Sequence, residues 1–144
     1  MIACADAGSK KKALEILSSS LSPFLKNHSR EKIFQQLIAR ERLGSTGLGT
    51  GVAIPHCRLP GLEAPMAAML TLAEAIPFDS ADNNNVDILF GLVVPEESNE
   101  EHLQILASLA ELFTDPKLCA QLRNASDNHE LLNALHQWQQ HAAA

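Results

Sequence analysis

One histidine stands beside a glycine-rich loop, in a setting that suits chemistry at an imidazole ring. Residues 44–57 read GSTGLGTGVAIPHC, so glycines alternate with small residues before a short apolar run. Residues 52–54 are typical of a strand, and Pro55 cannot continue a sheet ladder because it has no backbone N–H. We therefore expect a break at Pro55 and His56 at a strand end, firmly held but reachable. With an ordinary pKa of ~6.5, such a ring is largely neutral near pH 7 and can act as a nucleophile.

The same segment resembles the active-site signature of phosphotransferase-system IIA domains of the fructose/mannitol/nitrogen-regulatory family (type-2 EIIA). The signature has an acidic residue, six arbitrary positions, alternating apolar and small residues, and then Pro-His. It is filled here by Glu41, Leu48, Gly49, Gly51, Val52, Ala53, Ile54, Pro55, His56 and Cys57. In this family the histidine carries a phosphoryl group, so the resemblance implies that His56 does. Cys57 stands where the family often has glycine.

The resemblance also implies the partners of the reacting ring. It predicts that Nε2 of His56 attacks while a backbone carbonyl orients Nδ1. Arg40 lies sixteen residues before His56, where the family has an arginine beside the phosphate, and its planar fork suits phosphate oxygens. His102 matches the family's second histidine, which faces the first. We expect it in the first turn of a helix, mostly exposed and kept neutral by the helix dipole.

Backbone amides of the glycine loop would supply further donors to a phosphoryl group. The expected phosphate-binding residues are Ser45, Thr46, Gly47, Gly49 and Gly51. The side chains of Ser45 and Thr46 could instead cap or turn the loop. Cys57 is not expected to be catalytic, because neighbouring side chains on a strand point to opposite faces. The other histidines, at 28, 129, 136 and 141, are expected to be solvated.

Composition narrows the class of partner. The chain has 144 residues, 46% hydrophobic and 19% charged, an ordinary balance for one globular domain over residues 1–144. The net charge of −6, the scattered basic residues and the scarcity of aromatic residues argue against nucleic-acid binding. No apolar window approaches the ~18 residues of a membrane span. A protein partner fits this acidic chain better.

Cysteine usage favours a reducing compartment. Three cysteines lie far apart, without CxxC or Cys/His metal spacing. Reduced thiols and a cytoplasmic location are the expectation. The N-terminus lacks the features of a signal peptide. No cofactor or metal is expected, since a zinc site would need three protein ligands. A metal-dependent hydrolase built on His56 and His102 remains an alternative, as does a binding module with a vestigial site.

Hydrophobic periodicity and cap residues predict helices and strands along the whole chain. Strands are expected at residues 1–5, 52–54, 64–73 and 86–94, and a turn at 79–85. Helices are expected at 9–21, 29–42, 98–113, from 115 onward, and 127–140. Ser98 or Asn99 would cap the third helix, with Leu103 facing inward. The order of elements and the resemblance together imply an α/β sandwich. The resemblance implies a mixed sheet of about five strands flanked by helices on both faces.

The favoured interpretation is a histidine phosphocarrier. The resemblance implies a donor similar to HPr or to its nitrogen-branch counterpart NPr. The loop sequence at residues 44–49 and the absence of an attached permease domain favour the nitrogen-regulatory branch, with regulatory target proteins downstream. The alternative is a fructose-type IIA component of sugar uptake, which would pass the phosphoryl group to a sugar-permease IIB domain.

Overall fold

The fold is built around one central strand whose sequence is apolar almost throughout. The computed structural model describes residues 2–25, 27–80, 83–97 and 100–143, without the side chains of residues 101 and 137–143. The strands are β1 (Ile2–Ala5), β2 (Gly47–Gly49), β3 (Val52–Ala53), β4 (His56–Leu59), β5 (Met66–Ile76) and β6 (Val86–Pro95). The central strand is β6, and eight of its ten residues are buried, six of them hydrophobic, as expected for a strand covered on both faces.

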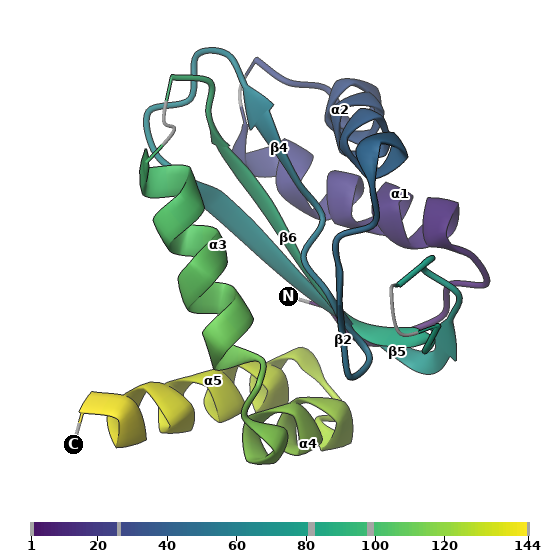
Figure 1. Cartoon of the computed structure of the whole chain (residues 1–144), viewed down its shortest axis with the longest axis vertical. Helices are drawn as coiled ribbons and strands as arrows, with labels where there is room; N and C mark the ends of the chain where they lie inside the picture. Colours follow the sequence, from purple (N-terminus) through teal and green to yellow (C-terminus); the bar gives the residue numbers. More distant parts are fainter. Residues whose placement is uncertain (1, 26, 81–82, 98–99, 144) are drawn as a thin grey trace.

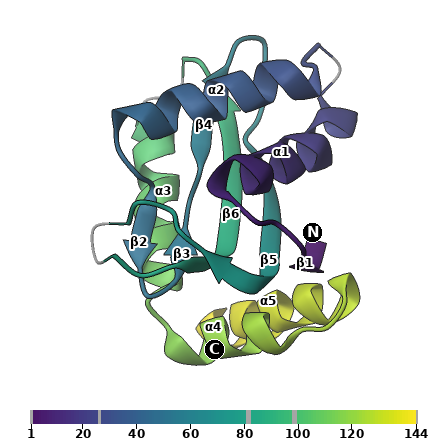
Figure 2. The same ribbon diagram turned by 90° about the vertical axis from the view of Figure 1, so that its right-hand side faces the viewer.

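The sheet is mixed. Within the described residues it has six strands in the order β1-β5-β6-β3-β2, with β4 also beside β6, and Figure 2 shows this order. The strands β3 and β4 run parallel to β6, whereas β5 is antiparallel to it. Beside β6, β3 and β4 therefore form two consecutive segments of one parallel strand, interrupted at residues 54–55.

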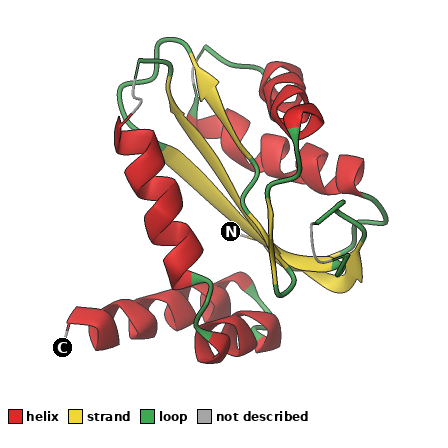
Figure 3. Cartoon of the chain, viewed as in Figure 1, coloured by secondary structure: helices red, strands yellow, loops and turns green. Residues whose placement is uncertain are grey.

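Helices cover both faces of the sheet (Figures 1 and 3). They are α1 (Lys10–Leu21), α2 (Arg30–Leu43), α3 (Glu100–Leu112), α4 (Pro116–Asn124) and α5 (Asn128–Ala143), with a 3-10 turn at Ser22–Phe24. One apolar core joins α1 and α2 to the sheet. A second core on the opposite face joins α4, α5 and the C-terminal part of α3 to it. This confirms the predicted α/β sandwich.

Helix starts follow the predicted cap residues. Ser9 and Ser29 accept hydrogen bonds from the backbone N–H groups three residues later, and Asp115 caps α4 with proline following it. Asp127 accepts from Glu130 N at 2.8 Å, but the Glu130 carboxylate turns to Ser126 rather than closing a capping box. The expected caps Ser98 and Asn99 lie outside the described residues.

Two strands were not predicted. The break at Pro55 is real, but the strand resumes at once as β4, because the Pro55 carbonyl still accepts from Leu92 N at 2.9 Å. The other missed strand, β2, lies within the glycine loop.

The predicted inward placement of Leu103 is wrong, since its side chain is 66% exposed. Residues 79–80 and 83–85 form an irregular connection.

Candidate functional site

His56 begins β4, and both nitrogens of its ring are engaged. Nδ1 lies 2.9 Å from the carbonyl oxygen of Ile54, two residues earlier. A carbonyl only accepts, so Nδ1 carries the hydrogen and donates it. Nε2 accepts a hydrogen bond from Arg40 Nε at 3.3 Å, and a guanidinium only donates. The ring is therefore the neutral Nδ1–H tautomer, with the lone pair of Nε2 directed toward the surface depression that Arg40 also lines.

Arg40 comes from the last turn of α2. Its Nη1 donates to the carbonyl of Gly44 at 2.8 Å while its Nε faces His56. The helix end thereby fixes the direction of the guanidinium. Arg40 lies sixteen positions before His56 in the chain and contacts its ring, as the family resemblance implied.

His102, in the first turn of α3, stands against His56. The two ring centroids are 5.1 Å apart, and the rings meet edge to face at 77°. The predicted convergence of His56, Arg40 and His102 is confirmed by these contacts. The expected exposure of His102 is wrong, because only 6% of the residue is accessible. Its Nδ1 is buried and has no hydrogen-bond partner among the described residues.

Burial and neighbouring cations keep both rings neutral. Burial lowers the pKa of His56 below 6.5, opposed by the hydrogen bond to Ile54, and the charge of Arg40 lowers it further. The pKa of His102 is lowered mainly by burial and next by the neighbouring His56. A neutral imidazole is the form that can attack an electrophile.

Arg58 belongs to the same site and was missed in the sequence. It is exposed on β4 two residues after His56, on the same strand face. Its charge lowers the pKa of both histidines. The period-two spacing would have identified it, had a strand been predicted after Pro55.

His56 borders two shallow depressions on the surface. One of about 410 Å³ is lined by Arg40, Arg58 and His102, together with residues of α2. The other, of about 340 Å³, is lined by Ser45, Thr46 and Gly47 together with residues of α3. His56 and Arg40 line both, so a ligand on Nε2 would be open to solvent and to a partner.

Only the first part of the glycine loop, residues 45–47, lies beside the site among the residues predicted to bind phosphate. Ser45 donates to the carbonyl of Phe78 at 2.7 Å and accepts from Gly47 N at 3.1 Å. Both the N–H and the hydroxyl of Thr46 are bonded to the buried carboxylate of Glu41. The side chains of Ser45 and Thr46 therefore hold the loop. A side chain at Gly47 would collide with Ser80, which explains the need for glycine there.

The structure does not bring the other two glycines to the depressions beside His56. Gly49 lies in β2 and lines neither of them. Gly51 follows at the β2–β3 turn with φ +85°, where an added Cβ would lie 2.6 Å from Arg123 Nη2. The positive φ explains this glycine as a turn residue.

The structure agrees with the expectations for Cys57, His129 and His136, but not with that for His28. Cys57 points into the core, and burial raises the pKa of its thiol to about 12, which makes it a poor nucleophile. His129 and His136 are exposed, as expected. His28 is not solvated: it is 7% exposed, and Nε2 bonds the carbonyl of Pro60 at 2.9 Å. His141 is among the residues whose side chains are not described.

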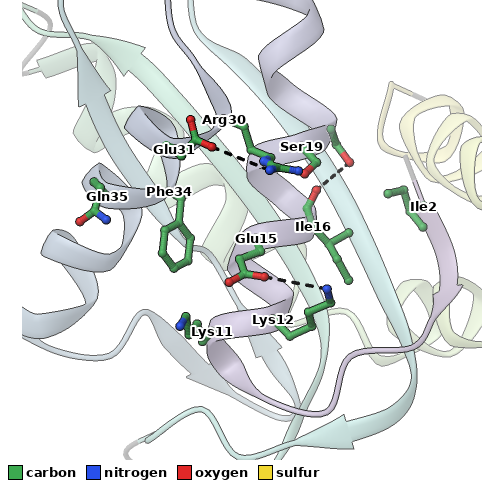
Figure 4. A pocket seen from close by; sticks show the side chains of 11 residues that line it. Ile2, Lys11, Lys12, Glu15, Ile16, Ser19, Arg30, Glu31, Phe34 and Gln35 are labelled. Atoms are coloured by element: carbon green, nitrogen blue, oxygen red, sulfur yellow. Dashed lines mark hydrogen bonds and ion pairs between the residues drawn. The ribbon is translucent and has the colours of Figure 1, made fainter.

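A larger groove lies away from His56. A groove of about 800 Å³ is lined mainly by residues of α1 and α2, and Figure 4 shows Phe34 and Ile16 in its lining together with the ion pairs Arg30–Glu31 and Lys12–Glu15. Its lining contains no histidine or cysteine. The chemistry-bearing side chains are therefore gathered at the shallower site around His56.

In the part of the chain that the structure describes, no three His, Cys, Asp or Glu side chains are grouped so that they could hold a metal ion. None of the described helices combines the length and the apolar character needed to cross a bilayer.

The chain is similar to known proteins over most of its length. Residues 1–138 match the family model described as "Phosphoenolpyruvate-dependent sugar phosphotransferase system, EIIA 2". A nitrogen regulatory protein of Pseudomonas aeruginosa is 44% identical over 118 residues, which cover 82% of this chain and 77% of that relative.

Solved structures show the same fold. The crystal structure of nitrogen regulatory protein IIA-Ntr from Neisseria meningitidis superposes with a TM-score of 0.85 at 37% identity, covering 92% of this chain and 90% of that one. The Escherichia coli complex of enzyme IIAMtl with phosphorylated enzyme IIBMtl contains a chain with a TM-score of 0.74 at 20% identity. That match covers 93% of this chain and 92% of that one, and it supports the fold alone.

Proposed function

Because this chain belongs to the type-2 EIIA family of the phosphotransferase system, we propose that it carries a phosphoryl group on Nε2 of His56. The family makes the chain a phosphotransfer component, and its relatives favour the nitrogen-related branch. The observation that carries the proposal is the state of one ring. Nδ1–H of His56 donates to a carbonyl, so Nε2 carries the lone pair, which accepts a hydrogen bond from Arg40 Nε.

The reaction needs little movement of this chain. The lone pair of His56 Nε2 attacks the phosphorus of a phosphohistidine on the donor protein. As the new N–P bond forms, the donor's N–P bond breaks and its electron pair returns to the donor ring. His56 keeps its hydrogen on Nδ1 throughout. Such transfers depend mainly on positioning and on stabilisation of charge at the equatorial oxygens.

Three side chains are placed to stabilise that charge. Arg40 would exchange its contact with Nε2 for one with a phosphoryl oxygen, since a guanidinium suits phosphate geometry. Arg58, on the same strand face as His56, adds a second cation. His102, neutral and in edge contact with His56, would donate one hydrogen bond. We assign these roles as part of the proposal, and we infer that the loop at Ser45, Thr46 and Gly47, which lines one depression beside His56, borders the bound phosphoryl group.

Partner choice follows from the surroundings of His56. Two exposed leucines line the depressions beside His56: Leu43 is 84% and Leu48 44% exposed. Leu103, which follows His102 in α3, is 66% exposed. A transient interface of modest size could cover them when a donor docks. We propose an HPr-like or NPr-like phosphocarrier as donor and regulatory proteins as later partners, in the cytoplasm. A fructose-type role, with a sugar-permease IIB domain as acceptor, is the alternative.

The test is phosphorylation by a phosphoenolpyruvate-driven carrier system, with intact mass measured under alkaline conditions because N–P bonds are acid-labile. The parent should gain one phosphoryl group, and His56→Ala should stay folded and gain none. His129→Ala, which removes an exposed histidine of α5, is the matched control and should behave as the parent. Equal phosphorylation of His56→Ala would contradict the assignment.

The same assay separates the two branches. HPr-like and NPr-like donors are offered in turn, and a sugar-permease IIB domain is then added to the phosphorylated protein. Faster phosphorylation by the NPr-like donor, without transfer to IIB, supports the nitrogen-related branch. Efficient transfer to IIB would support the fructose-type alternative.

A further inference from the structure

A buried carboxylate lies behind the reactive histidine. Glu41 is in the last turn of α2, and its side chain is only 4% exposed. Its oxygens accept from Lys10 Nζ at 2.8 Å, from Thr46 N at 3.3 Å and from the Thr46 hydroxyl. A carboxylate so deeply buried persists only when it is paired and hydrogen-bonded, and here every bond leads to another element.

One set of bonds leads from Glu41 to Nδ1 of His56. Thr46, held twice by Glu41, accepts from Ile54 N through its own carbonyl at 3.1 Å. Ile54 in turn accepts from His56 Nδ1 at 2.9 Å. The carbonyl that determines the tautomer of His56 therefore lies on a peptide segment whose position depends on Thr46, and so on Glu41.

A second set leads from Glu41 toward Nε2. Arg40 precedes Glu41 in the chain, and its Nη1 binds the carbonyl of Gly44 at 2.8 Å. The N–H of Gly44 donates to the Glu41 carbonyl at 3.1 Å. The turn that directs Arg40 Nε at His56 thus begins at Glu41. Displacing Glu41 would disturb the contacts of both ring nitrogens.

Lys10 ties this arrangement to α1. Its ammonium lies 4.5 Å from the ring centroid of Phe78 and 3.8 Å from Asp79, in addition to its pairing with Glu41. The carbonyl of Phe78 accepts from Ser45, the residue before Thr46. Lys10 therefore supports the loop from two sides. Its neighbours Lys11 and Lys12 are exposed.

We propose that Glu41 is a positioning residue for phosphoryl acceptance by His56, and that Lys10 is the counterion that holds it in place. The inference rests on the proposed function. Glu41 touches no reacting atom: it acts through Thr46 and Ile54 on the tautomer of His56, and through the helix end on Arg40. Removing the charge of either partner allows the Ile54 carbonyl to shift, and the ring then also populates the Nε2–H tautomer, which cannot attack.

The experiment combines two readouts on Glu41→Gln, Lys10→Met and Lys10→Arg. Two-bond 1H–15N correlation spectra of the unphosphorylated protein report the tautomer of His56, and single-turnover assays report its phosphorylation rate. Glu41→Gln and Lys10→Met should show the Nε2–H tautomer and lose rate by about tenfold or more, since a misplacement on the order of 1 Å can cost about a hundredfold. Lys10→Arg keeps the positive charge and should retain the Nδ1–H tautomer and the phosphorylation rate. Lys11→Met, on the exposed side of the same helix, should match the parent.

A purely structural role of the Glu41–Lys10 pair would give a different result. If Glu41→Gln and Lys10→Met lose stability but keep only the Nδ1–H tautomer and the parent rate, the ion pair is structural and the proposal is overturned. Should Glu41→Gln not fold, Lys10→Met and Thr46→Val, which removes one bond to the carboxylate, decide by the same criteria. Because the tautomer is measured without phosphate, a parent that accepts no phosphoryl group refutes the proposed function while the spectra still test Glu41.

Discussion

His56 is prepared for reaction by contacts at opposite edges of one ring. The carbonyl of Ile54 takes the hydrogen of Nδ1, and Arg40 directs a donor at Nε2. The same Arg40 that would bind a phosphoryl group also disfavours protonation of the ring, because two cations would then meet. Arg58 acts in the same sense. These groups would keep the nucleophile neutral before transfer and stabilise the anion after it.

The lowered histidine pKa values predict how stability depends on pH. Unfolding returns His56 and His102 to about 6.5, so between this value and the lower folded values the unfolded chain binds more protons. The free energy of unfolding therefore rises with pH in this window and is lost on acidification below about 6.5. Urea titrations between pH ~5 and ~7.5 measure this. His56→Ala and His102→Ala should each flatten the dependence, whereas the exposed His129→Ala should not. A parent whose stability is level across the window would contradict the shifts.

The phosphorylation rate should follow the same titration. At fixed donor state, the rate of single-turnover acceptance should rise with pH through a midpoint below 6.5 and level off above that midpoint, because only neutral His56 attacks. An NMR titration of the His56 ring gives the pKa independently. A kinetic midpoint above 6.5 would show that a different group limits acceptance.

At the scale of elements, the helix starts could be predicted from the sequence, whereas the pairing of the strands could not. Ser9, Ser29 and Asp115 begin helices because a side-chain oxygen close to an exposed N–H is a local event. The convergence of Arg40 and His102 on His56 came from the resemblance. The strand after Pro55 was missed because its pairing depends on β6, thirty-six residues away. Arg58 was missed with it, and His28 is buried by a contact with Pro60 that no local pattern shows.

Arg123 of α4 connects the β2–β3 turn to the start of β6. Arg123 Nε contacts both carboxylate oxygens of Asp87 at 2.9 and 3.0 Å, and Nη2 donates to the carbonyl of Thr50 at 2.7 Å. Arg123→Met should lower the free energy of unfolding by about 1–3 kcal/mol, since a half-buried carboxylate loses its charged donor. Chemical denaturation measures the loss.

The matched control for Arg123→Met is Arg30→Met. Arg30 pairs with Glu31 at 3.8 Å with both side chains more than half exposed, so solvent screens the pair and its loss should change stability little. Equal losses in the two variants would mean that Arg123 adds nothing to the hairpin beyond a surface ion pair.

At the scale of the whole molecule, net charge and local charge differ around the site. The chain carries −6, yet Arg40 and Arg58 border His56 itself. Exposed glutamates follow close by in the chain: Glu96 and Glu97 come directly after β6, and Glu100 begins α3 two residues before His102. A basic donor would thus be attracted by the acidic surface and by the acids after β6, while the cations at the centre remain for the phosphoryl group.

This division predicts that docking and chemistry separate in the variant Glu97→Lys/Glu100→Lys. The association rate with a phosphorylated donor should fall at low salt, and added salt should slow the parent as well, because exposed charges are screened over about 10 Å at ~0.1 M. The rate of transfer within the bound complex should stay near that of the parent. Stopped-flow mixing over a range of donor concentrations separates the two rates.

The control Glu15→Lys/Glu31→Lys makes the same change in net charge in the α1–α2 groove, away from His56. If both double variants slow association equally, only net charge attracts the donor; if neither does, docking takes place on another face.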